Sequence, residues 1–472
     1  MKTIKYLMIG ALTFGFSAIG MAQEESPVEA VKALVKSNDP DAEKQIKSIY
    51  KKNKKNGEVI TGIARVYYEE KDTANARYYA ELATKLNYGP AYIVLGDIAA
   101  LADDGGGAAR MYDQAVYFAP KDPSAYYKYA MVYRKVHLDA AIGKLDDLGV
   151  QRPDLVENGQ VNILKGRIYD LANKVEQAAE TYNKVPLSQM EDRDVVSAAR
   201  ANYLLGNYEK SQEIIDHGLK GSPRKFTYNQ LGMFNHTQLK NYDKALEYAD
   251  RMINHSDSVK MNPEIYGVYA KALNGAKKHQ EAIDVYKKTL ELEFDSQDKK
   301  AGVIKDLADA YKGLDDYENA VTYYDLFLKT VSRATLADYA DLGRLYVQYA
   351  NTLEGDAKME KLQKADQIYA DLAEKNADAK EYSLFWRARV GTMMDPDASQ
   401  GKAQPFYEEL VNIISEKAEK DNADKARLKE GGNFLMVYYL KIKDDVPTSK
   451  QFAEKVIAID PENETAKQIL AL

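Results

Sequence analysis

A small residue recurs along the chain at nearly regular intervals, and this spacing limits the fold more than any other feature. In several units an alanine follows it at a fixed distance, as in Gly96/Ala108 and Ala308/Ala320, and a tyrosine stands four positions after that alanine. Intervals of three and four place side chains on one face of a helix, and small residues let two helices pack closely. The pattern therefore predicts an all-α chain of helical hairpins. The recurring small residues, here called anchor residues, are Ala64, Gly96, Ala130, Gly166, Ala199, Gly232, Ala270, Ala308, Gly343 and Ala388, with less regular units at Ala30 and Val437.

This series predicts about twelve hairpins, with turn signals such as Gly206-Asn207 between the two helices of a unit. Some units depart from the pattern. Asn202 and Asn235 replace an aromatic residue, and insertions of ten and three residues precede Ala365 and Ala403. A single hairpin cannot bury its own apolar face, so neighbouring hairpins must stack. We therefore expect one helical array over residues 23–472, with irregular repeats from about residue 343 onward.

Residues 92–120, YIVLGDIAALADDGGGAARMYDQAVYFAP, carry in order an aromatic residue, Leu-Gly, alanines, a further aromatic residue and a closing proline. On this segment and on the anchor series, the chain resembles the tetratricopeptide repeat family over nearly all of residues 23–472. The resemblance implies a right-handed superhelical solenoid whose concave groove is lined by the first helix of each hairpin. It also implies a final capping helix at about residues 462–472.

Residues 1–22 have the composition of a secretory signal peptide. Lys2 and Lys5 precede an apolar run, and a small-x-small site ends at Ala22, before Gln23. The apolar run is shorter and more broken than a membrane span of about 20 residues, although a retained anchor is the alternative. The chain has no cysteine, so it offers neither a disulfide framework nor a lipid attachment site at the cleavage point. We expect an exported protein of a Gram-negative bacterium, periplasmic or associated with the outer envelope.

The net charge of −7 becomes −9 when Lys2 and Lys5 are removed with residues 1–22, which hold no acidic residue. This sign opposes nucleic-acid binding, which depends on Lys and Arg that neutralise phosphates. No segment after the signal peptide approaches the length of a membrane span.

The sequence contains no assembled catalytic or metal-binding motif. No HExxH, P-loop, G-x-S-x-G or dinucleotide-binding fingerprint is present among the 472 residues. Residues 395–409 have the alternating oxygens of a calcium loop at Asp395 and Asp397, but Phe406 stands where a bidentate glutamate is required. We interpret this segment as a capped turn between helices and expect no enzyme activity, metal or cofactor. A hydrolase hidden in the irregular residues 352–364 or 393–404 is the least favoured alternative.

Basic residues are enriched directly after the anchor residues, at a position that should lie near the concave face. Six of the ten clearest units have Lys or Arg there, in a chain with 65 such residues out of 472. Such a track suits carboxylates or phosphates of a partner. The competing interpretation is a polar helix position where long basic side chains pack well. The candidate binding residues of this track are Arg65, Arg167, Arg200, Lys271, Arg344 and Arg389.

Tyrosine is abundant, with 36 residues. The doublets Tyr67-Tyr68 and Tyr126-Tyr127 cannot have both members facing the core, because neighbours on a helix are about 100° apart. Tyr68 and Tyr127 are therefore further candidates for the groove, since tyrosine is a common contact residue in binding surfaces.

These features predict a non-enzymatic scaffold of the cell envelope that holds a partner protein or an extended peptide, anionic in character, in its groove. The alternative is binding of a carbohydrate or cell-envelope polymer through groove tyrosines and Trp386.

The stretch DDGGGAAR, residues 103–110, has the glycines of a phosphate-binding loop, but its first six residues align without a gap with residues 315–320, DDYENA. Gly105, Gly106 and Gly107 then form the opening turn of a second helix, with Asp104 at or next to its N-cap. We predict a weak helix start rather than an anion cradle, because glycine destabilises a helix relative to alanine.

Overall fold

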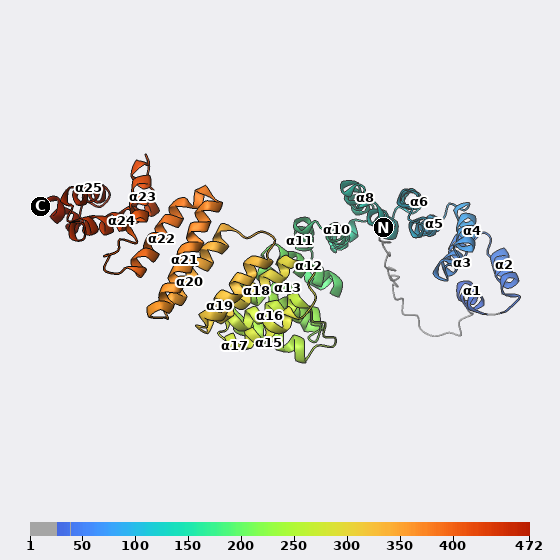
Figure 1. The fold of residues 1–472 in the computed structure, drawn as a ribbon. Coiled ribbons are helices and arrows are strands. Elements are labelled where there is room, and N and C mark those ends of the chain that lie inside the picture. The colour runs from blue at the N-terminus through green and yellow to red at the C-terminus, as the bar shows by residue number, and fades with distance from the viewer. Residues whose placement is uncertain (1–25, 38) are drawn as a thin grey trace. The chain divides into compact units, whose positions relative to one another are not determined.

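The computed structural model describes residues 26–37 and 39–472, and this part of the chain is built from helices and turns with no strand (Figure 1). The predicted signal peptide and its cleavage site lie outside the described residues. The chain divides into two compact units, Met1–Asn235 and His236–Leu472. The division falls within helix α14 (Phe226–Gln238).

The first unit contains thirteen complete helices in its described part, and the 3-10 turn Leu187–Gln189. Its helices are α1 (Pro27–Lys36), α2 (Ala42–Lys52), α3 (Gly57–Glu69), α4 (Thr73–Thr84), α5 (Gly89–Leu101), α6 (Gly105–Phe118), α7 (Pro123–Tyr133), α8 (Leu138–Gln151), α9 (Pro153–Glu157), α10 (Gln160–Leu171), α11 (Val175–Tyr182), α12 (Asp192–Leu204) and α13 (Tyr208–Gly221).

The second unit contains twelve complete helices and the 3-10 turn Ala377–Ala379. Its helices are α15 (Tyr242–Asn254), α16 (Pro263–Gly275), α17 (His279–Leu290), α18 (Gln297–Gly313), α19 (Tyr317–Thr330), α20 (Leu336–Ala350), α21 (Gly355–Lys375), α22 (Lys380–Met394), α23 (Gln404–Glu416), α24 (Asn422–Lys441), α25 (Val446–Ile457) and α26 (Glu464–Leu470).

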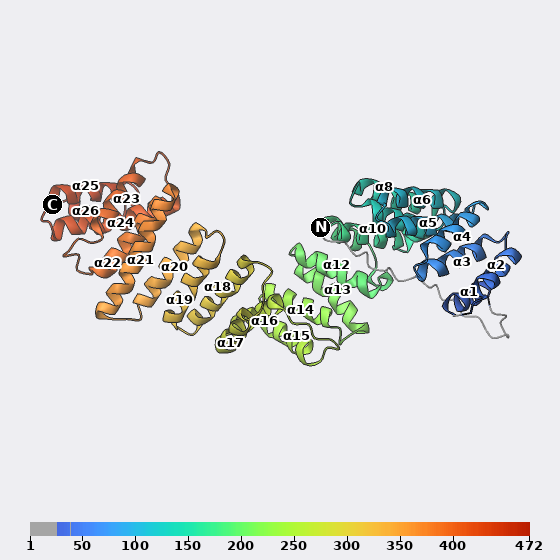
Figure 2. The same cartoon turned by 45° about the vertical axis from the view of Figure 1, so that its right-hand side comes forward.

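Apart from the short α9 and the closing α26, the described helices follow one another as twelve pairs (Figure 1, Figure 2). Consecutive helices such as α3 and α4, α5 and α6, or α18 and α19 pack side by side. The predicted all-α array of about twelve hairpins is therefore confirmed. We call the two members of each pair the first and the second helix. The first helices are α1, α3, α5, α7, α10, α12, α14, α16, α18, α20, α22 and α24.

Several pairs are held by a tyrosine of the second helix that packs on the anchor residue of the first. A Cβ atom added to Gly96 would lie 2.4 Å from the Tyr112 ring, and one added to Gly166 would lie 2.8 Å from the Tyr182 ring. Only a small anchor residue allows this approach. The tyrosines that the repeat places four positions after an alanine are all buried: Tyr112, Tyr182, Tyr286, Tyr324, Tyr369 and Tyr407.

The turn between the two helices has a common geometry in eight pairs. A residue with positive φ follows the first helix, and the next residue is the N-cap of the second. At Asp103, where φ is 61°, the following Asp104 N–H donates to the Ala99 carbonyl at 2.9 Å. This pattern is the Schellman ending of a helix. The positive-φ residues are Lys71, Asp103, Asn173, Gly206, Lys240, Lys277, Asp315 and Asp444.

The alignment of DDGGGA with residues 315–320 is confirmed. Helix α6 begins at Gly105, and the Asp104 carboxylate accepts from the Gly107 N–H at 2.7 Å. In α19 the Asp316 carboxylate accepts from the Asn319 N–H at 3.1 Å in the same way. The glycines therefore form the first turn of a capped helix.

The departures from the repeat have local structural explanations. Asn202, fully buried in place of an aromatic residue, pairs with Asn183 through two amide hydrogen bonds of 3.1 and 3.2 Å. The ten-residue insertion before Ala365 lengthens α21 to 21 residues. The Asp395 carboxylate accepts from the backbone N–H groups of Gln400 and Lys402, at 3.0 and 3.2 Å, and so closes the turn before α23.

Two substitutions of the same kind test the packing at the anchor residues. Gly96→Ala should lower the free energy of unfolding by about 1–3 kcal/mol, because its Cβ overlaps the buried Tyr112 ring. Gly105→Ala should raise it by about 0.5 kcal/mol, because a Cβ there meets no atom within 4 Å and alanine favours the helix. Urea denaturation followed by circular dichroism measures both. Equal changes in the free energy of unfolding for the two variants would contradict the close packing of the Tyr112 ring on Gly96.

Candidate partner-binding face

The first helices pack against one another in rows. In the first unit α3 contacts α5, α5 contacts α7, α7 contacts α10, and α10 contacts α12; in the second, α16 contacts α18. We call the side of the first helices that faces away from the second helices the first-helix face. All the predicted binding residues belong to these helices: Arg65 and Tyr68 to α3, Tyr127 to α7, Arg167 to α10, Arg200 to α12, Lys271 to α16, Arg344 to α20 and Arg389 to α22.

Arg167 is the most buried of the paired cations in the predicted track. Its Nε and Nη2 atoms each donate to the Asp194 carboxylate at 2.6 Å, and Asp194 is only 1% exposed. Burial opposes the charge, but the carboxylate more than offsets it and keeps the pKa of the Arg167 guanidinium above its usual range. This bidentate pair joins α10 to α12.

Three further cations of the track also have carboxylate partners. These pairs neutralise charge and brace the first helices. The partners are Asp170 for Arg200, at 2.6 Å; Glu430 for Arg389, at 2.5 Å; and Asp341 for Arg344, whose guanidinium also donates to the Tyr382 hydroxyl at 3.0 Å.

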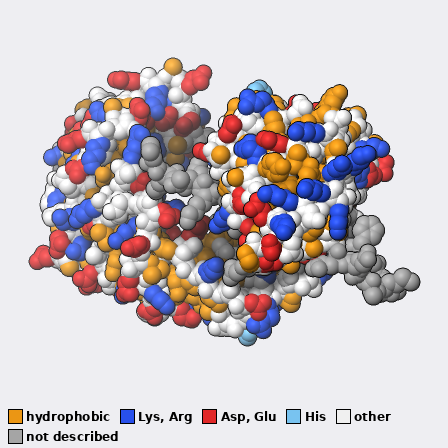
Figure 3. Space-filling view, turned by 90° about the vertical axis from the view of Figure 1, so that its right-hand side faces the viewer, with side chains coloured by type: hydrophobic (Ala, Val, Ile, Leu, Met, Phe, Trp, Pro, Cys, Tyr) orange, Lys and Arg blue, Asp and Glu red, His pale blue; other side chains and the backbone are white. Residues whose placement is uncertain are grey.

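Arg65 and Lys271 are exposed, and neither forms an ion pair with any residue in the described part of the chain. The predicted basic track thus divides into four cations that form ion pairs and two, Arg65 and Lys271, that form none among the described residues. Over the face presented in Figure 3, Lys and Arg side chains are likewise interspersed with Asp and Glu.

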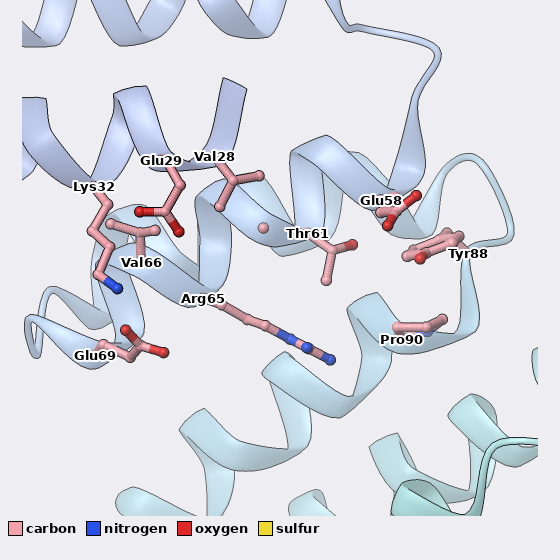
Figure 4. Close-up of a pocket in the computed structure, with 11 residues that line it drawn as sticks. Val28, Glu29, Lys32, Glu58, Thr61, Arg65, Val66, Glu69, Tyr88 and Pro90 are labelled. Atoms are coloured by element: carbon pink, nitrogen blue, oxygen red, sulfur yellow. The ribbon is translucent and has the colours of Figure 1, made fainter. Parts of the chain in front are cut away.

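Arg65 extends into a groove between α1, α3 and α5 (Figure 4). The groove has a volume of about 420 Å³. Thr61 lines the same groove one turn before Arg65, and its hydroxyl is buried without a hydrogen-bond partner. The exposed Arg65 guanidinium, rather than this buried hydroxyl, is therefore available to a bound group. The other residues that line it are Val28, Glu29, Lys32, Glu58, Gly62, Val66, Glu69, Tyr88 and Pro90.

The two members of each tyrosine doublet differ in burial. Tyr67 and Tyr126 are buried in the core, at 7% and 1% exposure, whereas Tyr68 and Tyr127 are half-buried. Burial raises the pKa of the Tyr68 hydroxyl, and the Asp97 carboxylate raises it further. Tyr68 therefore lies close to a charged group of the next first helix.

Sequence reasoning missed a second role of the buried repeat tyrosines. The Tyr112 hydroxyl donates to the Asp97 carboxylate at 2.7 Å, and the Tyr407 hydroxyl donates to Glu430 at 3.0 Å. Burial raises the pKa of the Tyr112 hydroxyl, and Asp97 adds to this shift. The sequence feature that could have indicated this hydrogen bond is Asp97, an acidic residue directly after the anchor residue Gly96.

Asp306 on α18 is a half-buried carboxylate that the anchor series did not single out. Burial raises its pKa to about 6, because the nearby charges of Lys271 and Lys305 do not offset the loss of water. The charge of Asp309 also raises the pKa of Asp306. Strongly shifted pKa values of this kind cluster at functional positions.

Trp386, named for the carbohydrate alternative, is engaged with its neighbours. Its ring stacks on Tyr369 with centroids 5.7 Å apart, and the Arg389 guanidinium lies 5.5 Å from its ring centre. The ring therefore contributes to packing between α21 and α22. Among the residues that the structure describes, no group of three or more His, Asp or Glu side chains is arranged to hold a metal ion.

Comparison with known proteins agrees with the helix pairs. The tetratricopeptide repeat family matches residues 306–329, which cover the C-terminal part of α18 and nearly all of α19. The chain is an all-α array of tetratricopeptide-like helix pairs. No curated protein matches the sequence of this tetratricopeptide-like array significantly. Within residues 26–37 and 39–472, no helix is long and apolar enough to cross a membrane.

Three solved structures resemble parts of the tetratricopeptide-like array. The C-terminal part of a TPR repeat-containing protein from Cytophaga hutchinsonii is 19% identical, with 58% of this chain and 99% of that chain covered and a TM-score of 0.48. A tetratricopeptide repeat protein from Parabacteroides merdae is 16% identical, with 52% and 96% covered and a TM-score of 0.34. Pseudomonas aeruginosa pilF is 17% identical, with 42% and 93% covered and a TM-score of 0.34. All three scores lie below 0.5, so these likenesses do not bear on function.

The raised pKa of Asp306 predicts a pH-dependent gain in stability from Asp306→Asn. Because the pKa of about 6 in the folded protein lies above the ordinary value of 3.8, ionisation destabilises the fold above about pH 6. The penalty disappears as the pH falls towards 3.8. At pH 8 the variant should be more stable by about 1–2 kcal/mol, a value reduced for solvent screening.

At pH 4 the variant and the wild type should have nearly equal stability, so the measurement at this pH is the internal control. Thermal unfolding followed by circular dichroism at both pH values measures the difference. A variant that is less stable than the wild type at pH 8 would contradict the raised pKa of Asp306.

Proposed function

We propose that the protein is a non-enzymatic scaffold that holds an extended segment of a partner protein against its first-helix face. The observation that carries the proposal is the groove between α1, α3 and α5, where the exposed Arg65 has no ion pair among the described residues and the buried Thr61 hydroxyl has no hydrogen bond. A carboxylate of a bound segment would form a charge-assisted hydrogen bond with the exposed Arg65 guanidinium. Tetratricopeptide-like arrays typically bind proteins, which agrees with this function.

We further propose that the scaffold acts in the cell envelope of a Gram-negative bacterium. The composition of residues 1–22 and the absence of cysteine support export. The exposed cations Arg65 and Lys271 support a partner with acidic groups, as expected from the basic track.

Charge reversal of these two cations tests the function. The double variant Arg65→Glu/Lys271→Glu should recover about tenfold less partner, since the loss of a charge-assisted contact costs about 1.5 kcal/mol or more. The measurement is quantitative mass spectrometry after crosslinking of the tagged protein in its own cells. Crosslinked peptides should map to first helices.

Lys220→Glu/Lys329→Glu is the matched control. It reverses one exposed lysine on a second helix of each unit, in α13 and α19, and should retain the partner. The proposal is wrong if both double variants recover the partner equally, or if the crosslinks map to second helices.

A further inference from the structure

The charges of three arginines act on the hydroxyl of Tyr127 on α7: Arg134 at the C-cap of α7 itself, Arg167 of α10 and Arg193 of α12. Burial raises the pKa of this hydroxyl, while the positive charges of Arg167, Arg193 and Arg134 oppose the rise. Asp194 acts on the same hydroxyl from α12. Glu191, which precedes α12, contacts two of the arginines. We call this group the Tyr127 cluster: Tyr127, Arg134, Arg167, Arg193, Asp194 and Glu191.

The two carboxylates of the Tyr127 cluster differ in how firmly they are held. Asp194 is 1% exposed and forms the bidentate pair with Arg167. The Glu191 side chain is 57% exposed, and its Oε2 atom lies 3.2 Å from Arg167 and 3.0 Å from Arg193. Glu191 is the N-cap residue of α12, but its side chain makes no capping hydrogen bond. Its carboxylate is therefore an exchangeable ligand of the two arginines, since exposed ion pairs are weak.

Arg134 has donor capacity that the described residues do not use. Its Nη1 atom donates to the Met131 carbonyl of its own helix, whereas its Nε atom is buried and has no hydrogen-bond partner. The Tyr127 cluster contains three guanidinium groups and two carboxylates, so it retains a positive charge. Tyr127, Met131 and Arg134 share one stripe of α7, because they are spaced four and three positions apart.

We infer that the Tyr127 cluster is an anion-binding site, now occupied by the chain's own Glu191, which binds an Asp or Glu side chain of a partner in exchange for Glu191. This inference rests on the proposed function, because it names the class of side chain that the first-helix face of the first unit binds. A partner carboxylate would replace the contacts that Glu191 makes with Arg167 and Arg193.

Fluorescence anisotropy with two synthetic peptides tests the inference on the full chain. One probe is a fluorescein-labelled dodecapeptide of alternating Ala and Glu, and the other has Gln in place of every Glu. The Glu peptide should bind at least about tenfold more tightly than the Gln peptide, as expected for charge-assisted contacts. Arg193→Met should weaken binding of the Glu peptide about tenfold and leave that of the Gln peptide unchanged, because Arg193 is one of the two arginines that hold the exchanged carboxylate.

Glu191→Gln gives the most specific readout. Removal of the competing carboxylate should tighten binding of the Glu peptide by about threefold or more, since the partner no longer displaces an ion pair. A merely structural role for Glu191 would predict no gain. The matched controls are Arg77→Met and Glu180→Gln, exposed residues of the second helices α4 and α11, which should leave both affinities unchanged.

Equal binding of the two peptides would overturn the anion site and leave the scaffold proposal standing. Failure of the Glu peptide to bind would likewise overturn the anion site, while the crosslinking experiment decides the scaffold proposal separately. Arg193 and Glu191 are exposed, so their variants should remain folded and the test stays valid.

Discussion

The packing of a second-helix tyrosine on a small first-helix residue is the interaction on which the rest of the structure depends. It sets how closely the two helices of a pair approach, as at Gly96 and Tyr112, where even one added carbon would overlap the ring. Because the tyrosine ring extends from the second helix across the anchor residue, its hydroxyl reaches the first-helix face. There the Tyr112 hydroxyl donates to Asp97. The same residue therefore builds the core and positions a carboxylate of the candidate binding face.

The features set by local spacing could be predicted from the sequence. The anchor residues, the buried tyrosines and the capped turn at Asp104 each depend on intervals of a few residues, and all are present in the structure. The glycines of DDGGGAAR could be placed because a second copy of the same turn, at residues 315–320, supplied the register.

The ion pairs of the first-helix face could not be predicted in the same way. Arg167 pairs with a residue 27 positions later, Arg200 with one 30 positions earlier, and Arg389 with one 41 positions later. No fixed interval relates these partners, since each is set by how neighbouring pairs stack. The series of basic residues can be read from the sequence, but their acidic partners become visible only when the helices are placed side by side.

Most cations of the basic track form ion pairs with acidic residues of the same chain. Few charged groups of the first-helix face therefore remain to select a partner. Arg65 lies in its groove without an ion pair to any described residue. Glu191 is exposed, and it is the carboxylate that we infer a partner replaces. Affinity of the array for an acidic segment would then come from these residues rather than from the basic track as a whole.

Hydrogen–deuterium exchange of the complex with the partner identified by crosslinking tests the central claim most directly. If the first-helix face holds the partner, binding should slow exchange in first helices such as α3, α7, α10 and α12. The second helices α4, α8, α11 and α13 should change little. Protection confined to the second helices, or equal protection of both sets, would contradict the account.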